Sequence, residues 1–127
     1  MGLDIHLEAD SRLSTTKIAS ALEKVGAHNI ELTAQSADGY FESGLSVTAT
    51  KSSDAAIYSE ETKGLSFPVA MRCYFRVKGP EPEGLSPLRD LELFLRHVAA
   101  ECEAHFLVSF QYESLMYWRD GGGLHVA

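Results

Sequence analysis

A chain of 127 residues, 45% of them hydrophobic and 23% charged, has the composition of an ordinary globular protein. This length predicts one domain, residues 1–127, that can bury enough surface to fold without a disulfide or a metal. The 18 acidic residues outnumber the 11 basic ones. The formal net charge of -7 argues against nucleic acids and anionic membranes as partners, because both require clustered positive charge.

The first predicted element is a strand over residues 2–9 whose two faces differ. Side chains alternate between the faces of a strand, and three apolar residues of this segment point to one side. We expect that side to be buried. The other side carries the acidic row, which consists of Asp4, His6 and Glu8.

A helix and two strands are predicted next. The hydroxyl-rich residues 11–16 can cap a helix, apolar residues then recur at helical spacing, and Gly26 ends the pattern. Alternation predicts strands over 29–35 and 40–51, separated by a turn at 37–39.

The chain then loses its regular pattern. Gly44 marks a bulge or a break within the strand over 40–51. Residues 52–66 are polar and have no clean period, which favours a mobile loop. A short strand at 56–58 is the alternative.

A second two-faced strand is predicted over 67–78. Its apolar residues again alternate with polar ones, and the polar side is basic. We call Arg72, Tyr74 and Arg76 the basic row, and Lys78 continues it. If the two unlike rows lie on neighbouring strands, they can form ion pairs across the sheet.

In the last third of the chain, the residue pattern predicts a helix and two strands. A serine and a proline open the helix, which runs over about 86–103. Alternation predicts strands over 105–111 and 115–119. Three consecutive glycines at 121–123 are expected to end regular structure and to leave a short tail.

This order of elements predicts an α+β fold. We expect one antiparallel, or mixed, sheet of five to six strands with two helices on one face. The arrangement expected is the ferredoxin-like βαββαβ order with an extra C-terminal strand. One face of the sheet, with both charged rows, would then stay open.

The acidic row permits two interpretations. In one, His6 is a base flanked by carboxylates, or a partial metal site. In the other, which we favour, the row forms exposed ion pairs with the basic row, each contributing less than about 1 kcal/mol. The sequence lacks recognisable nucleophile and phosphate-binding motifs, so we expect no cofactor and no metal.

The favoured function is a non-enzymatic protein-binding domain of bacterial type, acting as an immunity-like or regulatory partner. The expected binding residues are the acidic row, the basic row and Trp118 as an aromatic anchor. The expected partners are a basic protein or, through exposed aromatics, a second copy of the chain. The alternative is a small enzyme or ligand-binding domain at the open face, with His6 as general base and its pKa raised by the carboxylates.

The expected location is the cytoplasm. The start of the chain has no signal-peptide pattern, and no apolar run approaches the roughly 20 residues of a membrane helix. Cys73 and Cys102 fall on apolar stripes, where a free thiol packs like a small hydrophobic group. In being short, acidic and without catalytic motifs, the chain resembles the small bacterial immunity proteins of polymorphic toxin systems. That resemblance implies a protein that blocks a toxin by binding to it.

Overall fold

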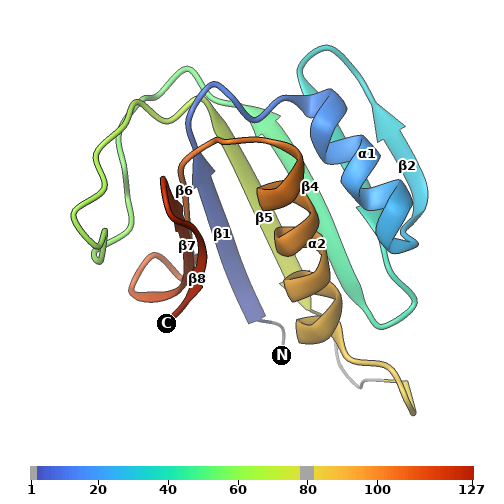
Figure 1. Ribbon diagram of the computed structural model, residues 1–127. Helices are drawn as coiled ribbons and strands as arrows, with labels where there is room; N and C mark the ends of the chain where they lie inside the picture. Colours follow the sequence, from blue (N-terminus) through green and yellow to red (C-terminus); the bar gives the residue numbers. More distant parts are fainter. Residues whose placement is uncertain (1–2, 78–81) are drawn as a thin grey trace.

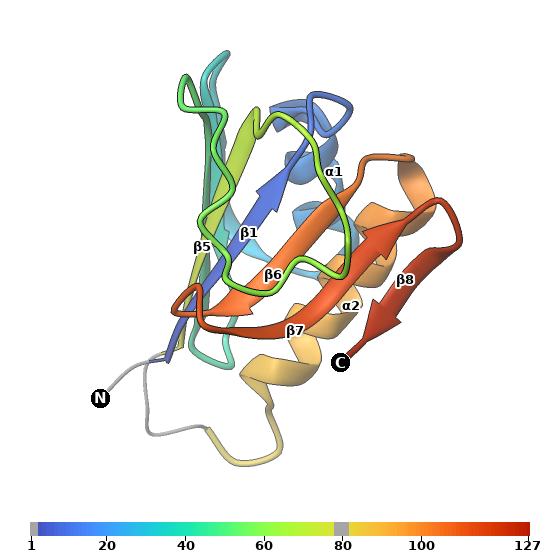
Figure 2. The ribbon, with the colours of Figure 1, turned by 90° about the vertical axis from the view of Figure 1, so that its left-hand side faces the viewer.

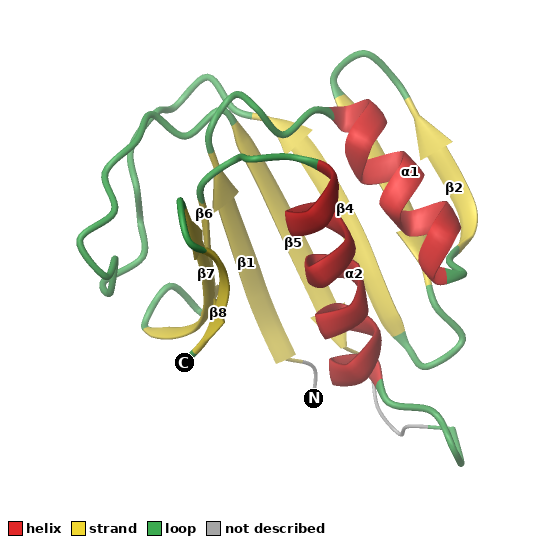
Figure 3. Ribbon diagram, viewed as in Figure 1, coloured by secondary structure: helices red, strands yellow, loops and turns green. Residues whose placement is uncertain are grey.

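The computed structural model describes residues 3–77 and 82–127, and in this part of the chain the protein has an α+β fold (Figures 1 and 3). Two helices accompany one eight-stranded sheet in the described residues, and every strand pairing is antiparallel. None of the described helices is long and apolar enough to cross a membrane. The elements are β1 (Leu3–Ala9), α1 (Thr15–Val25), β2 (His28–Leu32), β3 (Ser36–Tyr40), β4 (Leu45–Lys51), β5 (Met71–Val77), α2 (Pro87–Glu101), β6 (Phe106–Phe110), β7 (Ser114–Asp120) and β8 (Gly123–Val126).

The strand order across the sheet is β2-β3-β4-β5-β1-β6-β7-β8. Helix α1 leads from β1 to the edge strand β2, and α2 leads from β5 past β1 to β6. The predicted α+β class and antiparallel sheet are confirmed. The predicted size of five to six strands is wrong, and the ferredoxin-like arrangement is not matched in full. A β2–β3 hairpin is added at one edge, and two strands, instead of one, follow β6.

Both helices cover the same side of the sheet, which we call the inner face (Figure 1). The side chain of Ser14 caps α1 by accepting a hydrogen bond from the backbone of Lys17, and Gly26 ends the helix with a φ of 97°. Ser86 caps α2, and Pro87 opens it. The apolar sides of the helices and the inner face form one core, which includes Ile5, Leu7, Ile18, Leu22, Leu45, Val47, Phe75, Phe94, Leu95 and Val108.

The predicted turn at 37–39 is wrong, because these residues lie within β3. The turn precedes them, where the Thr33 hydroxyl accepts hydrogen bonds from the backbone of Gln35 and Ser36. Gly39 packs closely against neighbouring side chains instead. A Cβ atom there would lie 3.3 Å from Ile30 Cγ1 and 3.4 Å from Leu22 Cδ1.

The predicted strand over 40–51 is interrupted. Gly44, with a φ of 101°, lies in the turn that separates β3 from β4. The amide of Gly44 donates to the carbonyl of Phe41 at 3.0 Å and closes this turn. Gly44 predicted either a bulge or a break in this strand, and the structure shows a break.

The glycine-rich segment 121–123 does not end regular structure, so this prediction is also wrong. It forms a tight turn that joins β7 to the additional strand β8. Asp120 Oδ1 accepts a hydrogen bond from Gly122 N at 2.8 Å and lies 2.9 Å from His125 Nε2. The carboxylate stabilises the turn, while Gly123 supplies a φ of 110°.

Residues 52–70 join β4 to β5 without forming a helix or a strand, and we call this segment the strap. The prediction of a loop over 52–66 is confirmed in that respect, and no strand forms at 56–58. Figure 2 shows the strap crossing in front of β1 and β6, on the side of the sheet opposite the helices. This side, the outer face, is therefore partly covered, and the expectation of a fully open face is wrong.

Candidate functional site

All seven residues that were predicted to bind a partner point to the outer face. β1 and β5 are neighbours, so the acidic and basic rows do lie side by side. Trp118 on β7 belongs to the same face, because Leu107 pairs with Glu8 on one side and with Trp118 on the other. Across β1 and β5, the directly paired residues are Asp4 with Arg76, His6 with Tyr74, and Glu8 with Arg72.

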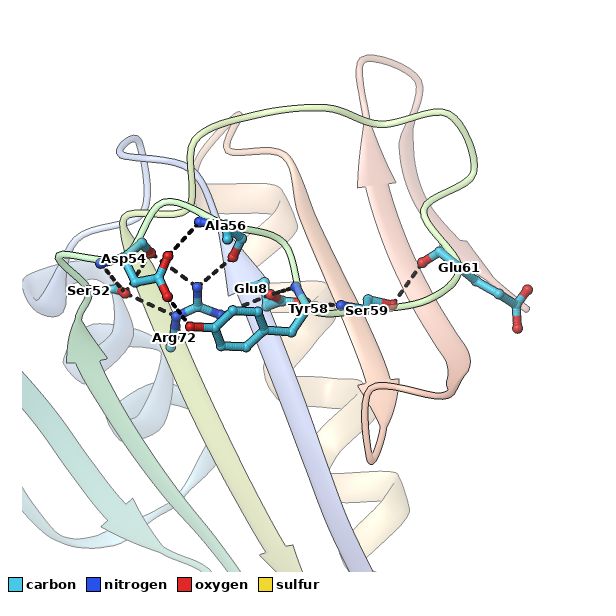
Figure 4. A network of polar contacts seen from close by, with 8 residues as sticks. All are labelled: Glu8, Ser52, Asp54, Ala56, Tyr58, Ser59, Glu61 and Arg72. Atoms are coloured by element: carbon cyan, nitrogen blue, oxygen red, sulfur yellow. Dashed lines mark hydrogen bonds and ion pairs between the residues drawn. The ribbon is translucent and has the colours of Figure 1, made fainter.

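Glu8 is a buried carboxylate that binds the strap to the sheet. Its side chain is 1% exposed, and Glu8 Oε2 lies 2.9 Å from Arg72 Nη1. The backbone amides of Tyr58 and Ser59, both in the strap, donate to Oε2 at 2.7 Å and to Oε1 at 3.0 Å (Figure 4). A buried charge is tolerated when an opposite charge and hydrogen bonds compensate it. The predicted ion pair across the sheet thus exists here, but it is buried and not exposed.

Other N–H groups of Arg72 donate hydrogen bonds to the strap (Figure 4). Its Nε donates to Ser52 Oγ at 3.0 Å, and its Nη2 donates to the carbonyl oxygens of Ala56 at 2.6 Å and Asp54 at 3.1 Å. The guanidinium also lies 4.1 Å from the centre of the Tyr58 ring. A guanidinium has five N–H donors, and this one is engaged inside the protein, so it positions the strap.

A stack of aromatic rings continues the site across the outer face. The His6 ring lies between Tyr74, at 5.1 Å between ring centres, and Tyr112, at 4.2 Å. The ring of Tyr58 meets Tyr112 edge to face at 5.5 Å. The stack therefore links β5, β1, the β6–β7 turn and the strap, and both faces of the His6 ring are covered.

The environment of His6 does not match that expected for a general base. Burial lowers the pKa of His6 from its usual 6.5, and this effect outweighs the opposing influence of the carboxylates of Asp4 and Glu8. The sequence-based expectation of a raised pKa is wrong in direction. The expectation counted the two carboxylates but not the desolvation that the neighbouring rings impose.

The other end of the two rows is more accessible. Tyr74 donates its hydroxyl hydrogen to Asp4 at 2.6 Å, and this bond raises the pKa of Tyr74. Asp4 thus bonds to the tyrosine and not to the directly opposed Arg76. The Arg76 side chain is exposed and has no hydrogen bond or ion pair with the described residues. Lys78, expected to extend the basic row, lies outside the described residues.

Trp118 and the strap meet at the far side of the face. The Lys63 ammonium group lies 5.1 Å from the centre of the Trp118 ring, and the His125 ring stacks on that indole at 5.1 Å. Trp118 is half-buried by these contacts. The predicted aromatic anchor is therefore engaged partly by the protein's own strap and last strand.

The strap and the outer face also contain buried apolar side chains. Val69, Leu107 and Leu115 are buried, yet none of them belongs to the core under the helices. Ser109 pairs with Leu115, and its fully buried hydroxyl has no hydrogen-bond partner among the described residues. The sequence predicted a single core and a wet outer face, whereas this part of the outer face is dry.

Four of the best-formed hollows among the described residues lie away from His6 and are not lined by the acidic row. One of about 320 Å³ lies further along the outer face, where Glu31, Asp38 and Tyr40 contribute to its lining. Among the described residues, no group of three His, Cys, Asp or Glu side chains could hold a metal ion.

Sequence reasoning missed Tyr58 and Tyr112. Tyr58 is 46% exposed, and Tyr112 sits in the β6–β7 turn with a φ of 62°. One signal could have pointed to the strap, because a connection of more than about 12–15 residues without secondary structure is uncommon unless it has a function. The attachment of the strap to Glu8 could not have been predicted from the spacing of residues in the sequence.

Comparison with known protein families, with curated proteins and with solved structures finds no match to this chain.

Proposed function

We propose that this protein is a non-enzymatic binding protein whose outer face, including the strap, contacts a protein partner. The observation that carries the proposal is the attachment of the strap by the buried carboxylate of Glu8. It holds an exposed tyrosine, Tyr58, on a fixed backbone above Arg72. Tyrosine is enriched among the residues that dominate binding energy, and a preorganised side chain loses less entropy on binding.

The charge of this surface favours a basic partner. The strap exposes Asp54, Glu60 and Glu61, and the chain as a whole has a formal net charge of -7. Complementary charge accelerates association and disfavours acidic competitors. A role as an immunity-like inhibitor or as a regulatory partner fits this surface, and the two free buried cysteines fit a reducing cytoplasm.

The alternative function, a small enzyme or ligand-binding domain with His6 as general base, receives less support. Both ring faces are occupied by tyrosines, and burial lowers the pKa of the imidazole. A catalytic base is expected in a concave site with room for a substrate. The face around His6 instead supports recognition.

The test is affinity capture from the native cell with matched baits, read by quantitative mass spectrometry. We expect the wild-type protein to retain one basic protein in near-equal amount, and Tyr58→Ala to lose it. Leu88→Ala is the control, because this exposed leucine lies on α2, on the helix side of the sheet. Equal recovery with the Tyr58→Ala bait, or no basic protein at all, would contradict the proposal.

A further inference from the structure

The helix side of the molecule carries a hollow that is separate from the outer face. It has a volume of about 440 Å³ and lies between the end of α1 and the middle of α2. We call it the helix groove. Its lining consists of three apolar residues, Val25, Leu93 and Ala100, and three basic ones, Lys24, Arg96 and His97.

The lining combines an exposed apolar side chain with basic side chains. Leu93 is 42% exposed. Beside it, basic side chains come from both helices, and one of them, Arg96, is paired with Glu92 at 3.3 Å. An apolar wall next to clustered positive charge suits a ligand that has an apolar body and an anionic end.

One of the protein's own carboxylates already occupies the charged end of the groove. Glu101 Oε1 lies 3.8 Å from Lys24 Nζ and 3.6 Å from His97 Nε2. Both separations are too long for a good hydrogen bond, and the Glu101 side chain is about half exposed. The carboxylate is therefore attracted to both basic groups without being fixed by either.

The same long separation from Glu101 leaves the imidazole of His97 without a hydrogen bond at this end. Its Nε2 atom is buried and has no hydrogen-bond partner among the described residues. An imidazole can donate from this nitrogen to a carboxylate oxygen. A carboxylate placed about 0.7 Å closer than that of Glu101 would satisfy it, since N–H···O bonds are typically about 2.9 Å long.

We propose that the helix groove binds a small aliphatic carboxylate in place of Glu101. The carboxylate of the ligand would lie between Lys24 and His97, with Arg96, itself paired with Glu92, at the rim. The aliphatic chain would cover the exposed side of Leu93. The volume of the groove falls in the range of about 300–1,000 Å³ that is usual for small-molecule sites. This site lies on the helix side and is independent of the function proposed for the outer face.

The experiment is a titration of the isotope-labelled protein with sodium octanoate, in which nuclear magnetic resonance measures the amide chemical shifts at each step. We expect saturable shifts confined to α1 and α2. Octylammonium chloride, with the same chain and the opposite charge, is expected to produce none of them. Absence of saturable shifts with octanoate, or equal binding of octylammonium, would overturn the proposal.

Two variants with opposite expected effects distinguish binding in the helix groove from nonspecific electrostatic attraction of octanoate to the protein. Lys24→Gln should weaken octanoate binding about fivefold, the effect of losing a partly exposed ion pair. Glu101→Gln should strengthen it by a similar factor, because the internal competitor is removed. Arg89→Gln, which removes an exposed charge on α2 outside the groove, is the control and should have no effect. Weaker binding by Glu101→Gln would refute the replacement of Glu101 by the ligand.

Discussion

A single buried carboxylate determines the character of the outer face. Glu8 lies on a strand whose other polar residues are more accessible, yet it is almost fully buried. Its charge is compensated by Arg72 and by two backbone amides of the strap. Loss of one partner of such a pair leaves the other buried and uncompensated, which costs far more than an exposed ion pair contributes.

Replacement of Glu8 by glutamine tests this role. We expect Glu8→Gln to lower the free energy of unfolding by about 3 kcal/mol, because Arg72 stays charged without its partner. Urea denaturation measures the change. Glu60→Gln, an exposed position on the strap, should shift the free energy by less than about 0.5 kcal/mol. Equal stability of the two variants would mean that the strap is held by other contacts.

His6 gives the protein a defined response to acid. Because its pKa is lowered on folding, the unfolded chain binds the proton more readily than the folded protein does. Above the usual pKa of 6.5, both states are neutral at this position and there is no effect. As the pH falls below that value, stability is lost until the folded protein is protonated as well.

The variant His6→Phe isolates this response, since phenylalanine keeps a ring in the stack but does not titrate. We expect the wild type to lose stability relative to His6→Phe as the pH is lowered from 7 to 5, measured by urea denaturation at each pH. A difference that does not change with pH, or that changes in the opposite sense, would contradict the direction assigned to His6.

At the scale of elements, the strap is irregular in conformation but firmly attached. The amides of Tyr58 and Ser59 donate to Glu8, and that of Glu60 donates to the Tyr112 carbonyl at 2.8 Å. The amide of Ile57 has no such acceptor in the described structure. Attachment of this kind is seen in hydrogen exchange, which reports local opening.

We therefore expect slow amide exchange at Tyr58, Ser59 and Glu60, and fast exchange at Ile57. In Glu8→Gln, protection at the first two positions should fall by at least tenfold, because the carboxylate that accepts their hydrogen bonds is gone. Nuclear magnetic resonance resolves the individual amides. Fast exchange throughout the strap of the wild type would show that the segment opens freely.

The contact between α1 and β3 depends on a missing side chain. Gly39 lies close against Ile30 and Leu22, and a larger residue would require these side chains to move. We expect Gly39→Val to lower the free energy of unfolding by about 1–3 kcal/mol through overpacking. Gly121→Ala is the matched control, because a Cβ atom at that position would meet nothing within 4 Å. Thermal or urea denaturation compares them, and equal costs would exclude the packing explanation.

At the scale of the whole molecule, local patterns predicted the elements better than their pairing. The caps at Ser14 and Ser86 and the alternation in β1 and β5 are local, so both helices and both two-faced strands were found. Ala37-Asp38-Gly39 and the glycines at 121–123 looked like turns or ends, and only tertiary contacts place them in or beside strands. The contacts of Glu8 with the strap join residues about 50 positions apart, and no spacing rule reaches that far.

The position of β1 has a consequence for how the chain is made. This strand is synthesised before both of its partners, β5 and β6, at residues 71–77 and 106–110. Both edges of β1 can therefore be covered only after residues 106–110 have left the ribosome. Sheets dominated by such distant pairings fold slowly, in milliseconds to seconds, because long loops must close first. Until then, the apolar side of β1 is exposed to aggregation and to chaperones.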